Sequence, residues 1–423
     1  MQKLTLKLND KELEKLNAAE EKKQSEYINL IASENYMSPA VRMALSSVTA
    51  NKYAEGYPGA RYYPGCDEAI DPIERLTQDR ALKAMKLSPK VWEVNVQPYS
   101  GSPANLEVLG ALVKPKGHPD GADTVLGMAL PVGGHLTHGH PVSFTGKFFN
   151  FVQYGLDTKG IINYDQIEKL AGEHKPRLII CGATAYSQKI DFKRFSEIAK
   201  KHGALLMADI AHIAGLVAGG VHPSPFPYCD VVTTTTHKTL RGPRGAMIFA
   251  RKELMPAINK AVFPGMQGGP HNNNTLAIGV AFGEIMKPAF KTYAKQIVKN
   301  ASVLAKELKK RNFTLVSGGT QNHLMLIDLQ TKSVSGNEAQ KILYSAGIIA
   351  NRNSIPNDPR KPFDPSGIRM GTPALTTRGF KEKEILLVAQ WIDEAISDPT
   401  AKNCARIKKR VQTLCKKFPP PGF

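Results

Sequence analysis

The sequence has few cysteines and no long apolar run. Its 423 residues include five cysteines, and their positions show no C-x-x-C or Cys/His metal spacing: 66, 181, 229, 404 and 415. We therefore expect reduced thiols in a reducing compartment. No apolar run approaches the ~18 residues of a transmembrane helix, and the first thirty residues lack the apolar core of a signal peptide. These absences predict a cytoplasmic protein without a membrane partner; a mature form in a mitochondrial or plastid matrix is the alternative.

Acidic residues are scarce relative to basic ones. Lys and Arg total 56 and Asp and Glu total 37, so the formal net charge is +19. Much of the excess lies in two segments, residues 251–311 and the tail after Asp398. Such an excess of positive charge suggests a polyanionic partner. Aromatic residues are only 7% and no nucleic-acid motif is visible, so nucleic acid stays open only as a secondary partner.

Short apolar segments alternate with helical ones between about residues 80 and 250. Continuous apolar strands separated by helices predict a mostly parallel sheet that is covered on both faces. The predicted strands cover residues 123–130, 176–182, 204–210, 230–236 and 245–250. A helix over 9–30 is expected before them, and a loop over 51–65. A long helix over about 275–312 and a second set of strands follow, which predicts a smaller C-terminal α/β domain. The predicted division is 1–50, 51–280 and 281–423.

Two charged side chains follow predicted strands of this sheet. The buried run VVTTTT is followed by His237 and Lys238, and the strand LLMAD ends at Asp209. A lysine beside other cationic groups can act as an amine nucleophile, and a carboxylate can keep a pyridinium nitrogen protonated. The 29 residues between Asp209 and Lys238 match one helix-plus-strand crossover, so neighbouring strand ends could bring both into one pocket. A solvated lysine and a helix N-cap are the alternative interpretations.

Other polar groups lie at element ends as well. Ser100, Gly101 and Ser102 precede a predicted helix, where hydroxyl and N–H groups can bind phosphate or simply cap the helix. Gly268 and Gly269 suit a close backbone approach or an ordinary turn.

Two further features concern flat rings and carboxylates. His135 in GGHLTHG could stack on a flat ring or be a hydrogen-bonded loop histidine. Its spacing from His138 invites a metal site, but no third ligand lies near in the sequence, so no metal is expected. Arg369 and Ser33 could bind a carboxylate; the alternative for Arg369 is a surface ion pair.

Together these groups make a complete set for a pyridoxal-phosphate enzyme: a lysine, an acid, an imidazole, a phosphate loop and a clamp for a substrate carboxylate. The chain resembles the serine hydroxymethyltransferase family over about residues 10–418. Its strongest stretches are LIASENY, NKYAEGYPGARYY, NVQPYSGSPAN, GGHLTHG, VVTTTTHKTLRGPRG, VFPGMQGGPHN, NRNSIPNDP and SGIRMGTPALTTRGF. The resemblance implies an α/β, fold-type-I transferase with a mostly parallel, seven-stranded-type large domain that binds the cofactor, an N-terminal helical arm and a small C-terminal domain.

The resemblance also implies an activity and its partners. The hydroxymethyl carbon of serine would pass reversibly to tetrahydrofolate, giving glycine and 5,10-methylenetetrahydrofolate, with pyridoxal 5'-phosphate bound to Lys238 as a Schiff base. The active sites would be shared within a homodimer or homotetramer. A folate-independent aldolase for β-hydroxy amino acids is the alternative within this chemistry; the match through Glu55, Asn353 and the C-terminal domain argues against it.

The resemblance assigns roles to single positions. The catalytic residues would be Lys238, Glu55, Asp209 and His237, with Glu55 as the proton-transfer carboxylate. The cofactor would contact Tyr53, Ser100, Gly101, Ser102, His135, Thr184, Asp209, His212, Thr235, Lys238, Gly268 and Gly269. The substrates would contact Ser33, Glu55, Tyr63, Asn353 and Arg369, with Asn353 at the folate site. Tyr53, Tyr63, Gly268 and Gly269 would act across the dimer interface.

Four features depart from the family pattern. Pro64-Gly65 stands where Gly-Gly is common, and proline should stiffen that loop. The segments 66–74 and 114–124 are longer than usual, and Thr184 replaces a common serine while keeping the hydroxyl. None of these departures removes a catalytic group.

Overall fold

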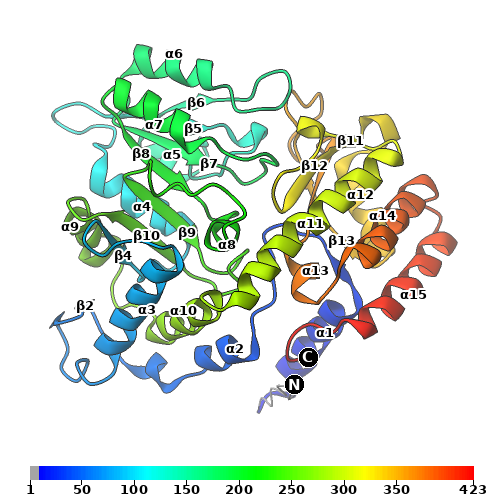
Figure 1. Ribbon diagram of the computed structural model, residues 1–423, viewed down its shortest axis with the longest axis horizontal. Coiled ribbons are helices and arrows are strands. Elements are labelled where there is room, and N and C mark those ends of the chain that lie inside the picture. Colours follow the sequence, from blue (N-terminus) through cyan, green and yellow to red (C-terminus); the bar gives the residue numbers. More distant parts are fainter. Residues whose placement is uncertain (1–8) are drawn as a thin grey trace. The chain divides into compact units, whose positions relative to one another are not determined.

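The computed structural model describes residues 9–423, which form two compact units (Figure 1). The large unit comprises Ala40–Thr184 and Lys189–Ala294; the terminal unit comprises the chain up to Pro39, Ala185–Gln188 and Lys295–Phe423. This division differs from the predicted one, since the N-terminal segment is not a separate arm. Its strand β1 (Ile28–Asn29) pairs in parallel with β13 (Ile348–Ile349) of the C-terminal region, which places it in the terminal unit.

The large unit is built on a seven-stranded sheet with the order β4-β10-β9-β8-β7-β5-β6. Its strands are β4 (Trp92–Asn95), β5 (Thr124–Met128), β6 (Asn150–Tyr154), β7 (Leu178–Gly182), β8 (Leu205–Asp209), β9 (Val231–Thr235) and β10 (Ala246–Arg251). The neighbours from β6 to β9 are parallel, whereas β10 runs antiparallel to β4 and β9. The predicted mostly parallel α/β fold is confirmed. Sequence reasoning missed β4 and β6, whose runs WEVN and NFVQY mix polar with apolar residues.

Helices cover this sheet. All five residues of β7 are buried, and because successive side chains of a strand point to opposite faces, both faces must be covered. The helices in this part of the chain are α2 (Pro39–Leu45), α3 (Ile70–Ala84), α4 (Gly101–Leu112), α5 (Phe144–Phe148), α6 (Tyr164–His174), α7 (Phe192–Lys201), α8 (Ala214–Ala218), α9 (Met255–Lys260) and α10 (Asn272–Ile285). A separate hairpin pairs β2 (Gly56–Tyr57) with β3 (Ala60–Arg61), inside the segment that was predicted as a loop.

Two predicted helices end differently in the structure. The long helix expected over 275–312 is two helices, α10 and α11 (Pro288–Lys310). Proline has no N–H to donate and suits the first turn of a helix, so Pro288 starts a new one. The N-terminal helix α1 (Lys11–Glu26) has Asp10 as its N-cap, with its side chain accepting from Glu12 and Leu13, and ends four residues early. It ends there because Ile28 enters strand β1.

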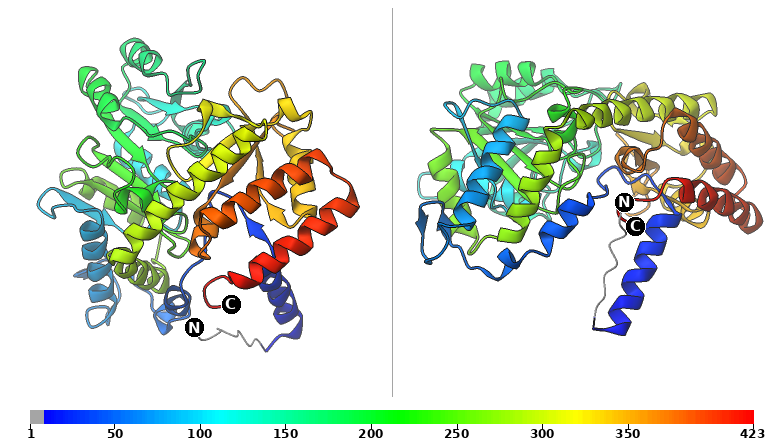
Figure 2. Two further views of the ribbon diagram at one scale, coloured as in Figure 1. Left: turned by 45° about the vertical axis from the view of Figure 1, so that its right-hand side comes forward. Right: turned by 60° about the horizontal axis from the view of Figure 1, so that its bottom comes forward.

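The terminal unit has a four-stranded antiparallel sheet with the order β11-β12-β15-β14. Its strands are β11 (Thr314–Leu315), β12 (Leu324–Asp328), β14 (Asn351–Asn353) and β15 (Gly367–Gly371). The helices besides α1 and α11 are α12 (Gly336–Ser345), α13 (Pro373–Thr377), α14 (Glu382–Ser397) and α15 (Ala401–Lys417). Figure 2 shows α14 and α15 side by side. The core includes Ile28, Met325, Leu343, Ile392 and Ile407. Within residues 9–423, no helix is both long and apolar enough to cross a membrane.

Candidate active site

Lys238 and Asp209 lie at neighbouring strand ends of the large unit. Strands β8 and β9 pair in parallel, with Asp209 opposite Thr233, so the spacing of 29 residues is one crossover between neighbours. The Nζ of Lys238, three residues beyond β9, donates to Thr235 Oγ1 over 3.0 Å. Ligands of open α/β sheets bind beyond the carboxyl ends of the strands. The two side chains that sequence reasoning paired therefore stand at the expected edge of the sheet.

Asp209 is buried among hydrogen-bond donors. Its Oδ2 accepts from Asn105 Nδ2 over 2.9 Å and its Oδ1 accepts from the N–H of Ala211 over 3.0 Å. His138 Nε2 lies 3.1 Å from Oδ2. Because the N–H of His135 donates to His138 Nδ1, the proton of a neutral His138 is on Nε2 and points at Asp209. Burial alone would raise the pKa of Asp209, but His138, His135 and Asn105 together hold it well below the ordinary value. Asp209 therefore stays ionised.

Asn105 and His138 are the residues that sequence reasoning missed as partners of Asp209. Thr233 Oγ1 donates to Asn105 Oδ1 over 2.8 Å, which turns the amide N–H₂ toward Asp209. The sequence suggests for His138 only a metal site, which is not expected because no third ligand lies near it in the sequence. The fold does bring a third group close: ligand atoms of His135, His138 and Asp209 all lie within 4.8 Å of one another. The Nε2 proton of His138 nevertheless points at the carboxylate, where a cation would have to lie. The second histidine of GGHLTHG was the signal for this contact.

His135 presents a neutral imidazole. Its Nδ1 accepts from the N–H of Thr137 and lies 2.7 Å from the Thr137 hydroxyl. That hydroxyl in turn accepts from Asn105. Burial, the largest cause, lowers the pKa of His135 to about 4. A neutral ring whose tilt is held by its own loop is suited to stacking on a flat ligand.

The N-terminus of α4 carries the candidate phosphate groups. Ser100 is the N-cap residue, yet its side chain makes no capping hydrogen bond, which disfavours the plain-cap interpretation. A Cβ on Gly101 would lie 2.7 Å from Thr235 Cγ2, so only glycine lets the helix start this close to β9. The free N–H groups at the start of α4 and the hydroxyls of Ser100 and Ser102 fit an anion here.

Three more predicted residues surround this edge. The N–H of Thr184 donates to Gly133 O over 2.8 Å, which joins Thr184 to the loop before His135. His212 is buried, and its carbonyl accepts from the Thr239 hydroxyl. Burial, with Lys238 and Arg244, lowers the pKa of His237 to about 3. His237 is therefore an uncharged neighbour of the lysine.

A second group of predicted residues gathers elsewhere in the large unit. The rings of Tyr53 and Tyr63 meet edge to face at 5.1 Å. A Cβ on Gly268 would lie 3.1 Å from Glu55 Oε1, and one on Gly269 would lie 3.3 Å from the Tyr53 ring. The charge of Glu55 raises the pKa of Tyr63. The four residues that the resemblance placed at the dimer interface, Tyr53, Tyr63, Gly268 and Gly269, thus form one cluster with Glu55.

The remaining predicted residues belong to the terminal unit. Arg369 lies on β15, is buried, and directs Nε and Nη2 to Asn351 Oδ1 over 3.3 Å. Burial lowers its pKa to about 10, which leaves it charged at neutral pH. Asn353, on the neighbouring strand β14, is paired with Gly367 of β15. The N–H of Gly371 donates to Leu30 O over 2.8 Å, which brings the segment of Ser33 to the end of β15.

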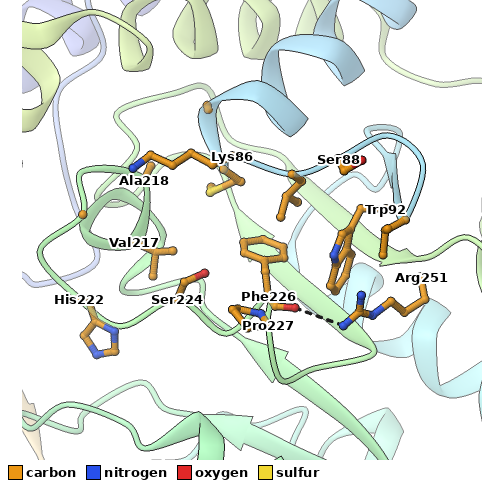
Figure 3. Close-up of a pocket in the computed structure, with 15 residues that line it drawn as sticks. Lys86, Ser88, Trp92, Val217, Ala218, His222, Ser224, Phe226, Pro227 and Arg251 are labelled. Carbon is orange, nitrogen blue, oxygen red and sulfur yellow. Dashed lines mark hydrogen bonds between the residues drawn. The ribbon is translucent and has the colours of Figure 1, made fainter.

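Another hollow, of about 490 Å³, lies at the amino-end edge of the large sheet (Figure 3). It is lined by the start of β4 at Trp92, the end of β10 at Arg251 and the residues after α3. Arg251 lies over the Trp92 ring and donates to the carbonyl of Phe226. None of the predicted site residues lines it, so we do not assign it to the active site.

An ionised aspartate and a lysine at neighbouring strand ends, beside a serine-lined helix N-terminus, define the class of protein. This is a pyridoxal-phosphate-dependent enzyme of fold type I. The family model for serine hydroxymethyltransferase matches residues 6–392. Curated relatives named serine hydroxymethyltransferase are 54% identical in Desulfotalea psychrophila, over 99% of this chain and 96% of the relative, and 53% identical in Legionella pneumophila, over 98% of each. One from Acidothermus cellulolyticus is 52% identical, over 99% and 97%. The chain belongs to the serine hydroxymethyltransferase family.

Proposed function

We propose that this enzyme moves the hydroxymethyl carbon of serine reversibly to tetrahydrofolate, giving glycine and 5,10-methylenetetrahydrofolate. The observation that carries the proposal is the Asp209 network beside Lys238. An aspartate held ionised by two side-chain donors, Asn105 and His138, can keep a pyridine nitrogen protonated. The family membership supplies the substrates.

The residues fit pyridoxal phosphate. When bound, the cofactor supplies a protonated ring that takes up the electron pair left as the carbon–carbon bond of serine breaks. Lys238 would hold its aldehyde carbon, and Asp209 would accept from the pyridine N–H. The start of α4 with Ser100, Gly101 and Ser102 would hold the phosphate, and His135 would lie against the ring. Thr184, His212 and Thr235 would border it, with His237 beside the lysine.

The residues proposed to bind the substrates come from the terminal unit and from the cluster around Glu55. In the terminal unit, Arg369 and Ser33 would bind the serine carboxylate, because a buried charged guanidinium is a strong carboxylate donor. Glu55 would take or give the proton at the serine hydroxyl or the folate nitrogens. Asn353 would contact folate.

We also propose that Tyr53, Tyr63, Gly268 and Gly269 act on the site of a partner copy, in a homodimer or homotetramer of the cytoplasm. Sedimentation of the holoenzyme distinguishes these assemblies, and a monomer that is fully active would contradict the shared site.

The test of the core assignment is Lys238→Ala. The protein reconstituted with pyridoxal phosphate should absorb in the visible and convert serine to glycine faster when tetrahydrofolate is added. Lys238→Ala should fold but lose the borohydride-sensitive link to the cofactor and nearly all transfer. A protein that cannot be reconstituted would refute the proposal. Serine cleavage that tetrahydrofolate does not accelerate would favour the aldolase alternative.

A further inference from the structure

The side chain of Glu55 extends from a backbone segment that the β2–β3 hairpin holds in one conformation. Glu55 directly precedes strand β2 of the β2–β3 hairpin, and its carbonyl accepts from the N–H of Tyr62 over 3.0 Å. Gly56 has φ +97, and a Cβ there would lie 2.3 Å from Ala60 O, so only glycine fits at position 56. The hairpin leaves little freedom in where the Glu55 side chain begins.

Arg61, on β3 of the same hairpin, reaches the backbone on both sides of Glu55. Its Nη1 donates to Ala54 O over 2.8 Å and to Gly56 O over 2.7 Å. Its side chain is 3% exposed, so these bonds are made away from water. The Ala54 carbonyl belongs to the peptide plane before Glu55, and the Glu55 carbonyl, which accepts from the N–H of Tyr62 next to Arg61, belongs to the plane after it. The Gly56 carbonyl belongs to the following plane. With these planes held by Arg61 and its neighbour Tyr62, the direction of the Cα–Cβ bond of Glu55 is fixed.

Two carboxylates of α3 hold the guanidinium from its other side. Arg61 Nε donates to Asp71 Oδ1 over 2.8 Å and Nη2 donates to Glu74 Oε2 over 2.6 Å. Asp71 also accepts from the N–H of Gly59, in the turn of the hairpin, over 2.6 Å. Gln97 Nε2 lies 2.9 Å from Glu74 Oε1 and 3.1 Å from Gly56 O. The hairpin is therefore anchored to α3 and to the segment that follows β4.

We propose that Arg61 is a positioning residue, which sets the place of the Glu55 carboxylate by holding the carbonyls of residues 54 and 56. The inference rests on the proposed proton-transfer role of Glu55. Lysine cannot substitute for Arg61 here, because all three guanidinium nitrogens are used in a planar fork and a single ammonium cannot reach the same four partners. Arg61→Lys keeps the charge between Asp71 and Glu74 but releases at least one flanking carbonyl.

The test is a double-mutant cycle on the holoenzyme, with kcat and KM for serine and tetrahydrofolate as readouts. Arg61→Lys should lower kcat roughly 30-fold with little change in KM for serine, and the visible absorbance of the bound cofactor should stay the same. In the Glu55→Gln background, Arg61→Lys should change kcat by less than about threefold, because the group that it positions is already gone. Arg80→Lys is the matched control. Arg80 is on α3 and donates to Gly279 O over 2.8 Å, away from the hairpin, so its effect should be equal in both backgrounds.

The outcomes separate the two claims. If Glu55→Gln leaves kcat unchanged, the proposed role of Glu55 fails and the inference fails with it. If Glu55→Gln impairs kcat but Arg61→Lys costs the same factor in both backgrounds, Arg61 is only structural and the positioning claim alone is overturned. If Arg61→Lys does not fold, Asp71→Asn replaces it in the cycle with the same expected coupling, since Asp71 holds both Arg61 and the hairpin turn.

Discussion

At the scale of single residues, the charge of Asp209 depends on donors that come from distant parts of the chain. Asn105 precedes it by 104 residues and His138 by 71. Hydrogen bonds to a charged group contribute about 1.5–3 kcal/mol each. Removing one donor should therefore weaken, but not abolish, the ability of Asp209 to stay ionised.

His138→Asn tests this contribution. Asparagine is too short to reach Asp209, so the pKa of Asp209 should rise and kcat should fall roughly tenfold or more. His140→Asn, in the same loop, is the control and should be nearly neutral. Steady-state kinetics and the pH dependence of the cofactor absorbance provide the measurement. Equal losses in the two variants would show that the loop matters and the Asp209 contact does not.

Glu107 on α4 is a buried carboxyl that the proposed function does not use. It is 0% exposed, and neither carboxyl oxygen has a hydrogen-bond partner among residues 9–423. Burial raises the pKa of Glu107 from 4.5 to about 8. The folded state therefore holds this proton more tightly than the unfolded chain does. The stability that depends on it is intact below pH 4.5 and is lost as the pH rises toward 8.

Glu107→Gln should therefore become more stable relative to the parent protein as the pH rises. Between pH 6 and pH 8 the gain should grow by about 2 kcal/mol, since one pKa unit corresponds to 1.36 kcal/mol. Urea unfolding at both pH values measures it. Glu197→Gln is the control, because its side chain is 63% exposed. A difference between Glu107→Gln and the parent that is the same at both pH values would contradict the buried-proton explanation.

At the scale of elements, the side chain of one arginine caps the C-terminal ends of two helices in the terminal unit. The last carbonyls of a helix have no partner within it. Arg378 is buried and donates to carbonyls at the end of α1 and at the end of α15: Gln24, Ser25, Tyr27, Cys415 and Phe418. A cation at helix C-termini is also favoured by the helix dipoles.

Arg378→Lys should destabilise the protein by about 3 kcal/mol, because several of these buried carbonyls lose their donor at once. Thermal unfolding followed by circular dichroism should show a melting temperature several degrees lower. Arg406→Lys is the matched change on α15, where an exposed arginine pairs with Glu394, and it should alter stability by less than about 0.5 kcal/mol. If the two changes cost the same, Arg378 does not join the helix ends in solution.

At the scale of the whole molecule, the net charge of +19 lies partly on a row of lysines. Lys287 precedes α11, and Lys291, Lys295 and Lys299 follow on it at intervals of four; all four are exposed. Only Lys299 has an ion-pair partner among residues 9–423, the carboxylate of Glu382. Such a row can raise the local concentration of an anionic substrate.

Changing these four lysines to glutamine should raise KM for polyglutamylated folate roughly threefold at low salt, and the difference should vanish near ~0.5 M salt. The control changes Lys402, Lys409, Lys416 and Lys417 of α15 to glutamine, which removes the same charge from another surface. If KM is unchanged at low salt, the row does not steer folate. If both sets act equally, net charge and not this row is responsible.

The sequence by itself determined the class of fold and proposed many residues of the candidate site. Apolar runs separated by helical segments favour a covered parallel sheet, and the spacing of Asp209 and Lys238 fits the ends of two neighbouring strands. Ser100, Gly101 and Ser102, at the start of a predicted helix, indicated an anion site without any knowledge of distant contacts. These features depend on periodicity and on neighbours in the chain, which a sequence displays directly.

Only the tertiary structure decided which groups complete the site. It paired Asp209 with Asn105 and His138, and it joined Arg61 to both sides of Glu55. It also moved the N-terminal segment into the terminal unit through β1. The physical reason is common to these cases. A buried hydrogen bond forms between groups that packing brings together, and packing depends on the whole chain, so no local pattern displays the partner.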